Sequence, residues 1–388
     1  MKRLLWITEH YPPTIGGMAN ACDRIVYHLR DFFHIDVLHL CRATQSKPPY
    51  RPAHVMEEAG GNCYVFHAHR DIAHTLNCVY LWLSKQHQKQ PYEALVAFGG
   101  YAPVFAVPTF AALLGLPYVL LLRGNDFDAG LFQPKRRDLL LTAIEQAAAV
   151  CCVSSDKVQK IRALLPHKPA VYYTPNGIDT AEWKAYEHDY RLAADWRKMH
   201  SEGRTVVGLF GQLKEKKGLD FFVDSLQQSA YSDEVHLLLI GDLEEEMRRR
   251  LTGAGQLHYT HIPFVERMQL IPYYLACDWM AIPSFYDGMP NVLLEAAALQ
   301  RPAIGSQVAG IADFIEHGRN GFLFEAANRH SLLEVLQTAL ELPANEREAM
   351  GKAAFKGLQA AFTARHEAGR YAGIFEEVLF RKNAAQGA

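Results

Sequence analysis

The sequence lacks long hydrophobic runs and any regular cysteine pattern. No apolar stretch approaches the roughly 20 residues that a membrane-spanning helix needs. The apolar run after Met1-Lys2-Arg3 lasts only four residues, too few for the h-region of a signal peptide, and we interpret it as a first buried strand. The seven cysteines form no CxxC pair and two are adjacent, which is typical of reduced, structural thiols. These absences together predict a cytoplasmic protein.

An excess of charge is also missing. Forty basic residues face 42 acidic ones, for a net charge of -2, so neither nucleic-acid binding nor strong electrostatic adhesion to membranes is expected. Two local basic runs, 135–137 and 248–250, are predicted to be solvated helix surface. An apolar stripe at 80–83, followed by Lys85 and Lys89, could lie on a membrane surface. We favour a helix that packs its apolar face into the core, so peripheral membrane contact stays open without being indicated.

Several catalytic motifs are absent as well. The chain contains no HExxH, Walker lysine loop or GxGxxG, which argues against a metalloprotease, a P-loop NTPase and an ordinary dinucleotide enzyme. His67, His69 and His74 have no cysteine or carboxylate at a spacing that would complete a zinc site. The sequence therefore predicts neither a metal site nor a bound cofactor.

What the 388 residues do contain is an alternation of short β-rich runs with longer helical stretches. This pattern predicts an α/β fold with parallel sheets covered by helices on both faces. Each half alone looks like a complete α/β unit. The predicted strands are 4–8, 35–40, 63–66, 95–98, 118–122, 150–153 and 171–174 in the first half, and 206–210, 236–240, 259–264, 279–283, 302–305 and 321–324 in the second.

A turn signal at 175–179 separates the two halves. We predict an N-terminal domain over 1–180, a linker over 181–203, a C-terminal domain over 204–363 and a final helix over 364–388. Apolar residues recur in that helix at helical spacing, among them Tyr371, Phe375 and Leu379. The spacing leaves two placements open: the helix caps its own domain or crosses back to the first.

The stretch from Pro283 to Ala296 carries the most chemical information. A strand is predicted to end at Pro283, and Pro290 stands where a helix would start. The unpaired N–H groups of a helix N-terminus and its dipole favour an anion, and ligands of open α/β sheets bind at the carboxyl ends of the strands. Gly288 allows close approach to the backbone, and Glu295, about a turn into the helix, could reach sugar or ribose hydroxyls.

Asp287 and Glu295, embedded in DGMPNVLLEA, closely resemble the acidic-x7-Glu motif of the family 4 retaining glycosyltransferases, which have the GT-B fold. Further matches follow in order along the chain. They are Tyr11-Pro-Pro-Thr-Ile-Gly16-Gly17, Ser154, Pro175-Asn-Gly-Ile-Asp179, Phe210-Gly-Gln-Leu213 through Lys217-Gly218, Leu239-Ile-Gly-Asp242 and Gly318-Arg-Asn-Gly321-Phe-Leu-Phe324. Each match alone is weak, but their order and spacing are specific.

The resemblance implies two Rossmann-like domains whose parallel sheets face each other across a central cleft, the first binding the acceptor and the second the donor. It implies a hexosyltransferase type of enzyme in glycan or glycoconjugate biosynthesis, retaining and metal-independent, with a nucleoside-diphosphate sugar as co-substrate and a sugar-containing or small-molecule acceptor. Glu295 would hold the ribose and Asp287 the donor-sugar hydroxyls. The other implied donor-binding residues are Gly16, Gly17, Gln212, Lys217, Gly288, Met289, Pro290, Asn291 and Val292.

Three positions depart from the family pattern. Gln212 stands where arginine is usual, so the phosphate site lacks one cation, which Lys214 or Lys216 could replace. Asp287 is one methylene shorter than the usual glutamate. Where many members carry His-Gly, this chain has Arg123-Gly124. We hypothesise that Arg123 acts in catalysis by supplying the missing positive charge; the alternative is an ion pair with Asp126.

Two other functions remain open from the sequence. A sugar-nucleotide epimerase or hydrolase with the same fold would need a general base, and no residue stands out for that role. A catalytically silent nucleotide-sugar-binding protein would account for the missing arginine.

Overall fold

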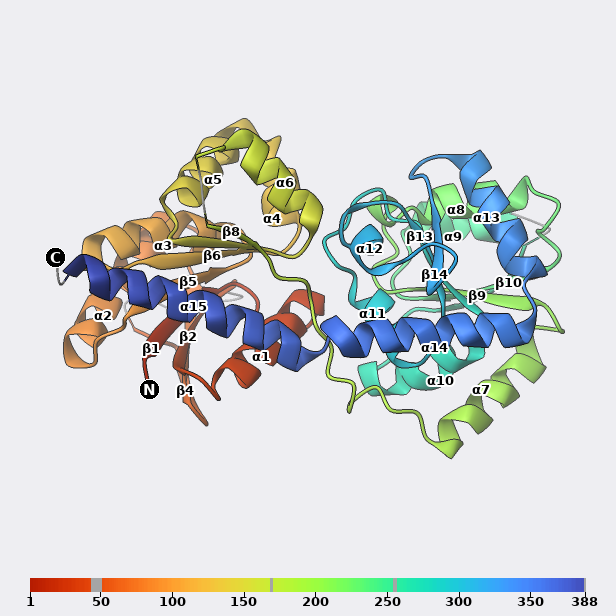
Figure 1. Ribbon diagram of the computed structural model, residues 1–388, viewed down its shortest axis with the longest axis horizontal. Helices are drawn as coiled ribbons and strands as arrows, with labels where there is room; N and C mark the ends of the chain where they lie inside the picture. Colours follow the sequence, from red (N-terminus) through yellow and green to blue (C-terminus); the bar gives the residue numbers. More distant parts are fainter. Residues whose placement is uncertain (43–50, 168–169, 254–256, 387–388) are drawn as a thin grey trace. The chain divides into compact units, whose positions relative to one another are not determined.

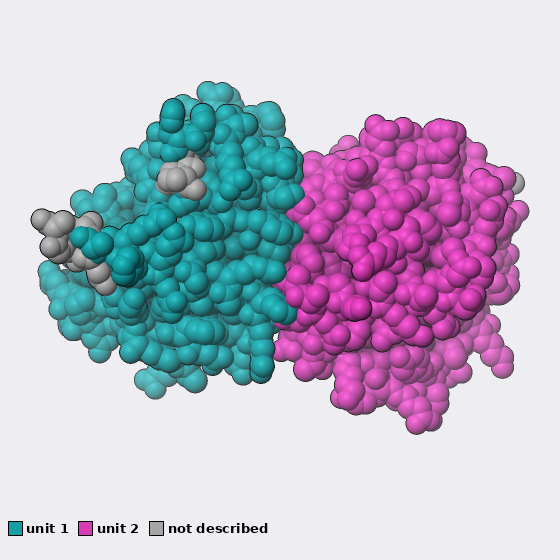
Figure 2. Space-filling view, viewed as in Figure 1, with its two compact units in different colours: residues 1–175, 364–388 teal, residues 176–363 magenta. Residues whose placement is uncertain are grey.

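The computed structural model describes residues 1–42, 51–167, 170–253 and 257–386. The chain divides into two compact units, each built on one sheet (Figures 1 and 2). Unit 1 comprises Met1–Pro175 and Ala364–Ala388, and unit 2 comprises Asn176–Thr363. Within the described part of the chain, no helix is both long and apolar enough to cross a membrane.

The sheet of unit 1 has the strand order β3-β4-β2-β1-β5-β6-β7-β8, and every pair except β3–β4 is parallel. All seven strands predicted for this half are present. The sequence missed β3, an antiparallel edge strand whose mostly exposed residues give no apolar run. The strands are β1 Arg3–Thr8, β2 His34–Arg42, β3 His54–Glu58, β4 Gly61–Ala68, β5 Ala94–Phe98, β6 Tyr118–Leu122, β7 Ala149–Cys152 and β8 Val171–Tyr173.

Helices cover both faces of this sheet. One core contains side chains of α1 and α15, and the other contains side chains of α2, α3, α5 and α6. In Figure 1, α15 runs along the sheet beside α1. The helices are α1 Gly17–Leu29, α2 Ile72–Lys89, α3 Tyr101–Leu114, α4 Asn125–Leu131, α5 Pro134–Gln146, α6 Ser155–Leu164 and α15 Ala364–Gln386.

The C-terminal helix α15 therefore belongs to unit 1, although 188 residues of unit 2 precede it in the chain. Its apolar residues Tyr371, Phe375 and Leu379 are buried in the same core as Trp6 and Ile25. Of the two placements open from the sequence, the structure has the helix on the first unit.

The sheet of unit 2 has the order β11-β10-β9-β12-β13-β14 and is parallel throughout. Its strands are β9 Thr205–Phe210, β10 Val235–Ile240, β11 His258–Ile262, β12 Trp279–Ile282, β13 Ala303–Ser306 and β14 Gly321–Phe324. The helical segments are α7 Glu187–His200, η1 Glu215–Lys217, α8 Leu219–Gln227, α9 Glu245–Gly253, η2 Arg267–Leu270, α10 Ile271–Ala276, α11 Asn291–Ala298, α12 Ala309–Phe314, α13 Arg329–Glu341 and α14 Ala344–Ala361.

The segment 181–203, predicted as a linker, is instead a packed part of unit 2. It contains α7, whose Ala193 and Trp196 are buried in the unit's core. Arg197 Nη1 donates to the carbonyl oxygen of Ala276 at 2.8 Å and pairs with Asp278. Only one narrow face of α7 is buried, so most residues of this segment are polar. Its composition therefore did not indicate that the segment packs into unit 2.

Candidate functional site

The strand order of unit 2 reverses between β9 and β12. From β9 the chain proceeds outward to β10 and β11, and from β12 it proceeds the other way to β13 and β14. In open α/β sheets the ligand crevice lies at the carboxyl ends of the two strands that flank such a reversal. The loops after Phe210 and Ile282 therefore mark the candidate site, and they lead into α8 and α11.

These two loops are packed tightly against each other. The backbone N–H of Phe285 donates to the carbonyl oxygen of Lys216 at 3.0 Å. Gly218 has a φ of 69°, and a Cβ there would collide with the carbonyl oxygen of Pro283. A glycine is required for both reasons, and the close approach sets Lys217 beside the loop that carries Asp287.

Lys217 and Asp287 form an ion pair in the structure. The other carboxylate oxygen of Asp287 accepts a hydrogen bond from the Gly288 N–H at 2.8 Å. The side chains of Lys217 and Asp287 are 29% and 17% exposed, so both groups remain accessible. The structure thus brings together three residues that the sequence singled out.

The N-terminus of α11 directly follows this pair. No side chain caps it, and its first turn contains no acidic residue, which leaves its amide groups suited to an anion. Pro290 occupies the N-cap rather than the first helical position. Proline has no N–H, so Pro290 can donate no hydrogen bond. Of the five donor-binding residues implied from Gly288 to Val292, the other four can each donate a backbone N–H.

Glu295 lies on α11 and accepts a hydrogen bond from the hydroxyl group of Tyr274, with 2.6 Å between the oxygens. The ring of Tyr274 is fully buried and lies edge-on to Phe210, at 4.7 Å between centroids, and to Trp183. Burial, followed by the charge of Glu295, raises the pKa of Tyr274 well above its ordinary value. The phenol therefore stays protonated and remains a donor to the carboxylate.

Neither Tyr274 nor Asn176 stood out in the sequence as a site residue. Asn176 is buried, and its amide nitrogen donates to the carbonyl oxygen of Met289 at 2.7 Å. This bond fixes the loop that leads into α11. The turn signal at 175–179 contained Asn176, but a turn residue more often bonds locally than with a loop 113 residues away.

Gln212 is exposed in the loop after β9. A Cβ at the neighbouring Gly211 would lie 3.7 Å from a methyl group of Val292, so this loop passes beside the first turn of α11. Of the two lysines predicted to compensate for Gln212, Lys214 is exposed and Lys216 lies 5.8 Å from the ring centroid of Tyr286.

In unit 1, Gly16 and Gly17 begin α1. Gly16 is the N-cap, with a φ of 140° and no atom within 4 Å of a Cβ built there. No side chain caps this helix either, and its first turn has no acidic residue. The geometry is compatible with an approaching anion, and a donor contact by Gly16 and Gly17 stays a prediction.

Arg123 does not have the environment predicted for a ligand-binding cation. Its side chain is only 1% exposed, and its guanidinium pairs with Glu367 at 3.4 Å and donates to the hydroxyl group of Tyr371 at 2.8 Å. The ring of Phe98 lies below it at 5.1 Å. Asp126 accepts instead from the backbone N–H of Arg123. Glu367 and Tyr371 lie on α15, far along the chain, and these contacts argue against the hypothesis that Arg123 supplies positive charge to a ligand.

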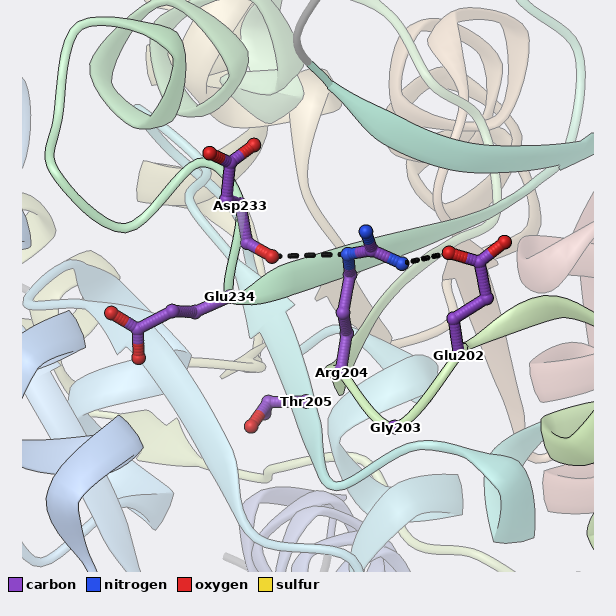
Figure 3. Close-up of a pocket in the computed structure, with 6 residues that line it drawn as sticks. All are labelled: Glu202, Gly203, Arg204, Thr205, Asp233 and Glu234. Carbon is purple, nitrogen blue, oxygen red and sulfur yellow. Dashed lines mark hydrogen bonds and ion pairs between the residues drawn. The ribbon is translucent and has the colours of Figure 1, made fainter.

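A separate hollow of about 360 Å³ opens at the other end of the unit 2 sheet (Figure 3). Arg204 crosses it and donates to Glu202 and to the carbonyl oxygen of Asp233. The hollow lies where β9 and β10 begin, at the edge opposite to the ligand-binding edge of a parallel sheet. We therefore do not include it in the site. Among the described residues, no three His, Cys, Asp or Glu side chains form a potential metal site.

Two family models match the chain. Residues 16–177 match a model described as a glycosyl transferase 4-like domain, and residues 204–341 match one described as glycosyl transferases group 1. An uncharacterized glycosyltransferase of Methanocaldococcus jannaschii is 23% identical over 88% of this chain and 89% of its own. The N-acetyl-alpha-D-glucosaminyl L-malate synthase of Bacillus anthracis is 25% identical over 67% of this chain and 68% of its own.

Solved structures share the fold along nearly the whole chain. The sucrose-phosphate synthase of Thermosynechococcus elongatus superposes with a TM-score of 0.81 at 17% identity, covering 98% of this chain and all of the other. Anabaena HepE in complex with UDP-glucose superposes with a TM-score of 0.77 at 17% identity, covering 97% of this chain and all of the other.

Proposed function

The chain belongs to the family 4 glycosyltransferases with the GT-B fold, and on this basis we propose how it transfers sugar. The donor is a nucleoside-diphosphate sugar bound by unit 2, and the acceptor is a hydroxyl group bound by unit 1. Transfer retains the anomeric configuration and needs no metal ion. The observation that carries the proposal is the convergence of Lys217, Asp287 and the uncapped N-terminus of α11 at the strand-order reversal.

Binding of the donor would replace the ion pair between Lys217 and Asp287. Lys217 turns to the diphosphate, and the freed Asp287 carboxylate accepts hydrogen bonds from donor-sugar hydroxyls. One charge-assisted hydrogen bond is worth about 1.5–3 kcal/mol and a helix terminus about 0.3–1 kcal/mol. Several such groups must act together toward the roughly 8–23 kcal/mol that enzymes remove from reaction barriers.

Glu295 would accept hydrogen bonds from the ribose. Its carboxylate is already oriented by Tyr274, so the donor meets a group with little rotational freedom left to lose.

In the proposed reaction the acceptor oxygen attacks the anomeric carbon from the face that the diphosphate leaves. The bond between that carbon and the phosphate oxygen breaks with its electron pair staying on the phosphate. The acceptor hydroxyl gives its proton to a phosphate oxygen. Lys217 and the α11 amides stabilise the negative charge that develops on the leaving group.

The first experiment is a thermal-shift panel of nucleotide sugars, starting with UDP-glucose because HepE, a structural neighbour, binds it. A ligand at a hundredfold its dissociation constant should stabilise by about 2.7 kcal/mol. The stabilising donor is then incubated with acceptors, with and without EDTA, and the product anomer is assigned by NMR. Donor binding without transfer or hydrolysis would favour the silent binding protein. Inversion at the anomeric carbon, or loss of turnover with EDTA, would contradict the proposal.

Two matched substitutions separate the roles in the site. Lys217→Met should weaken binding of both the nucleoside diphosphate and its sugar conjugate, about tenfold or more. Asp287→Asn should weaken only the conjugate, because it removes the negative charge and one of the two acceptor oxygens that face the sugar, while releasing Lys217 for the diphosphate. Isothermal titration with both ligands measures the difference. If Asp287→Asn lost equal affinity for the nucleoside diphosphate and for its sugar conjugate, Asp287 would not contact the sugar.

A further inference from the structure

Helix α3 of unit 1 exposes an apolar stripe to solvent. The stripe consists of Tyr101, Phe105, Ala112 and Leu113, with the uncharged Thr109 among them, and these residues follow one another along one helix face. The residues between them are mostly buried against the sheet. The whole of α3 contains no charged residue, whereas a surface helix ordinarily carries charge on its outer face.

The neighbouring elements extend this apolar surface. Phe132, at the end of α4, is 83% exposed, and Leu139 on α5 is exposed as well. On the other side of α3, Leu81 of α2 is 61% exposed. Helix α3 contacts both α2 and α5, and the side chains of all three pack on the same face of the sheet. The exposed apolar residues therefore belong to one face of unit 1.

Positive charge flanks the stripe on both sides. Helix α5 begins with Lys135, Arg136 and Arg137, and the exposed side of α2 has Lys85 and Lys89. The Arg136 guanidinium lies 4.4 Å from the ring centroid of Tyr101, so cation and aromatic ring are in direct contact at the edge of the stripe.

Acidic groups on these helices are few. Helix α2 has none, and α5 has Asp138, which pairs with Arg137, and Glu145 in its last turn. The aspartates of α4 are already bonded, Asp128 to Lys157 and Asp126 to backbone N–H groups. This face is thus positive in a chain whose net charge is -2.

We propose that this face of unit 1 docks on an anionic lipid bilayer. An apolar stripe enters the headgroup boundary, aromatic rings lie at the interface, and flanking lysines and arginines contact anionic headgroups. The charge pattern selects a bilayer over an apolar protein surface, because every unpaired charge beside the stripe is a cation. The inference does not rest on the proposed function, since docking requires neither donor nor acceptor.

The test is cosedimentation of the full chain with vesicles, without any substrate. Binding to vesicles containing phosphatidylglycerol is expected to exceed binding to pure phosphatidylcholine and to fall as salt screens the charges. Phe105→Ser and Leu113→Ser together should weaken binding about tenfold or more, since they remove two apolar anchors. Lys85→Gln with Lys135→Gln should weaken it about fivefold per charge, and only on the anionic vesicles.

Two matched controls lie on unit 2. Tyr190→Ser replaces an aromatic residue of α7 that is 53% exposed, and Arg248→Gln with Arg249→Gln removes two of the three charges in the basic run of α9. Neither should change vesicle binding, and melting curves of all variants should match the parent. Absence of binding to anionic vesicles, or equal losses in the α3 variants and the controls, would overturn the proposal. Each α3 substitution is also measured singly, so that a misfolded double variant does not decide the result.

Discussion

The side chain of Tyr274 has two roles: its ring packs in the core of unit 2, and its hydroxyl group hydrogen-bonds to the site residue Glu295. The ring lies in the core beside Phe210 and Trp183, and the hydroxyl reaches Glu295 at 2.6 Å. Removing the hydroxyl leaves the packing nearly intact and takes one hydrogen bond away from the carboxylate. Tyr274 is therefore a positioning residue, and its effect should appear in ligand affinity rather than in folding.

We expect Tyr274→Phe to weaken binding of the nucleotide-sugar donor about ten- to a hundredfold, the worth of one hydrogen bond to a charged group. Glu295→Gln should give a loss of similar size, and the two changes combined should not add, because they act on one interaction. Titration calorimetry measures each variant. Tyr273→Phe, at the half-buried neighbouring position, is the control; full additivity of the first two changes would separate Tyr274 from Glu295.

Two buried histidines should make the stability of the protein depend on pH. Burial, as the main cause, lowers the pKa of His39 in unit 1 and of His236 in unit 2 from 6.5 to about 4. The unfolded chain then binds more protons than the folded chain, so the free energy of unfolding decreases as pH falls from about 6.5 toward 4. Urea titrations across this window should show the decrease, and His39→Gln should reduce its slope. A urea midpoint that does not change between these pH values would contradict this prediction.

At the scale of elements, α15 is held to unit 1 by charge as well as by apolar packing. Glu367 accepts from Arg24 at 2.9 Å and pairs with Arg123, and all three side chains are at least nine-tenths buried. A buried carboxylate or guanidinium without its partner is costly, typically about 3–5 kcal/mol. The cluster therefore stabilises the position of α15 on unit 1.

Arg123→Ala should consequently lower the melting temperature while leaving donor affinity unchanged, with a loss of about 3 kcal/mol. Lys217→Ala should show the reverse pattern, since its side chain is partly exposed and its partner remains solvated. Calorimetric melting and donor titration of both variants give the comparison. If Arg123→Ala abolished donor binding at unchanged stability, the sequence-based role of Arg123 as a phosphate ligand would be restored.

The elements differ in how far the sequence could predict them. Buried parallel strands such as β5 and β6 are runs of apolar residues, so their existence and order followed directly from the pattern. The motif around Asp287 predicted Gly288 and the helix α11 at one sheet edge, the separate match through Lys217-Gly218 added Lys217, and the structure has these residues together there. The partners of Arg123 could not be predicted, because they lie 244 and 248 residues away. Periodicity revealed that α15 has an apolar face but not which core receives it.

At the scale of the whole molecule, the two units differ in how the chain builds them. Unit 2 is one continuous segment, whereas unit 1 is assembled from both ends of the chain. The five large apolar side chains that α15 buries, namely Tyr371, Ile374, Phe375, Val378 and Leu379, contribute about 1.5–3 kcal/mol each. Their sum is comparable to the roughly 5–15 kcal/mol by which a whole domain is stable.

A chain that ends at Thr363 should therefore lose unit 1 and keep unit 2. Without α15, the part of the sheet face that α1 does not cover is exposed, and Arg24 and Arg123 lose their shared carboxylate. Limited proteolysis with mass spectrometry should then show rapid cleavage within 1–175 and a resistant fragment that starts near Asn176. That fragment, made separately, should still bind the donor, but more weakly than the full chain, because it lacks the contact predicted for Gly16 and Gly17. A truncated chain whose two units resist protease equally would show that α15 contributes little to unit 1.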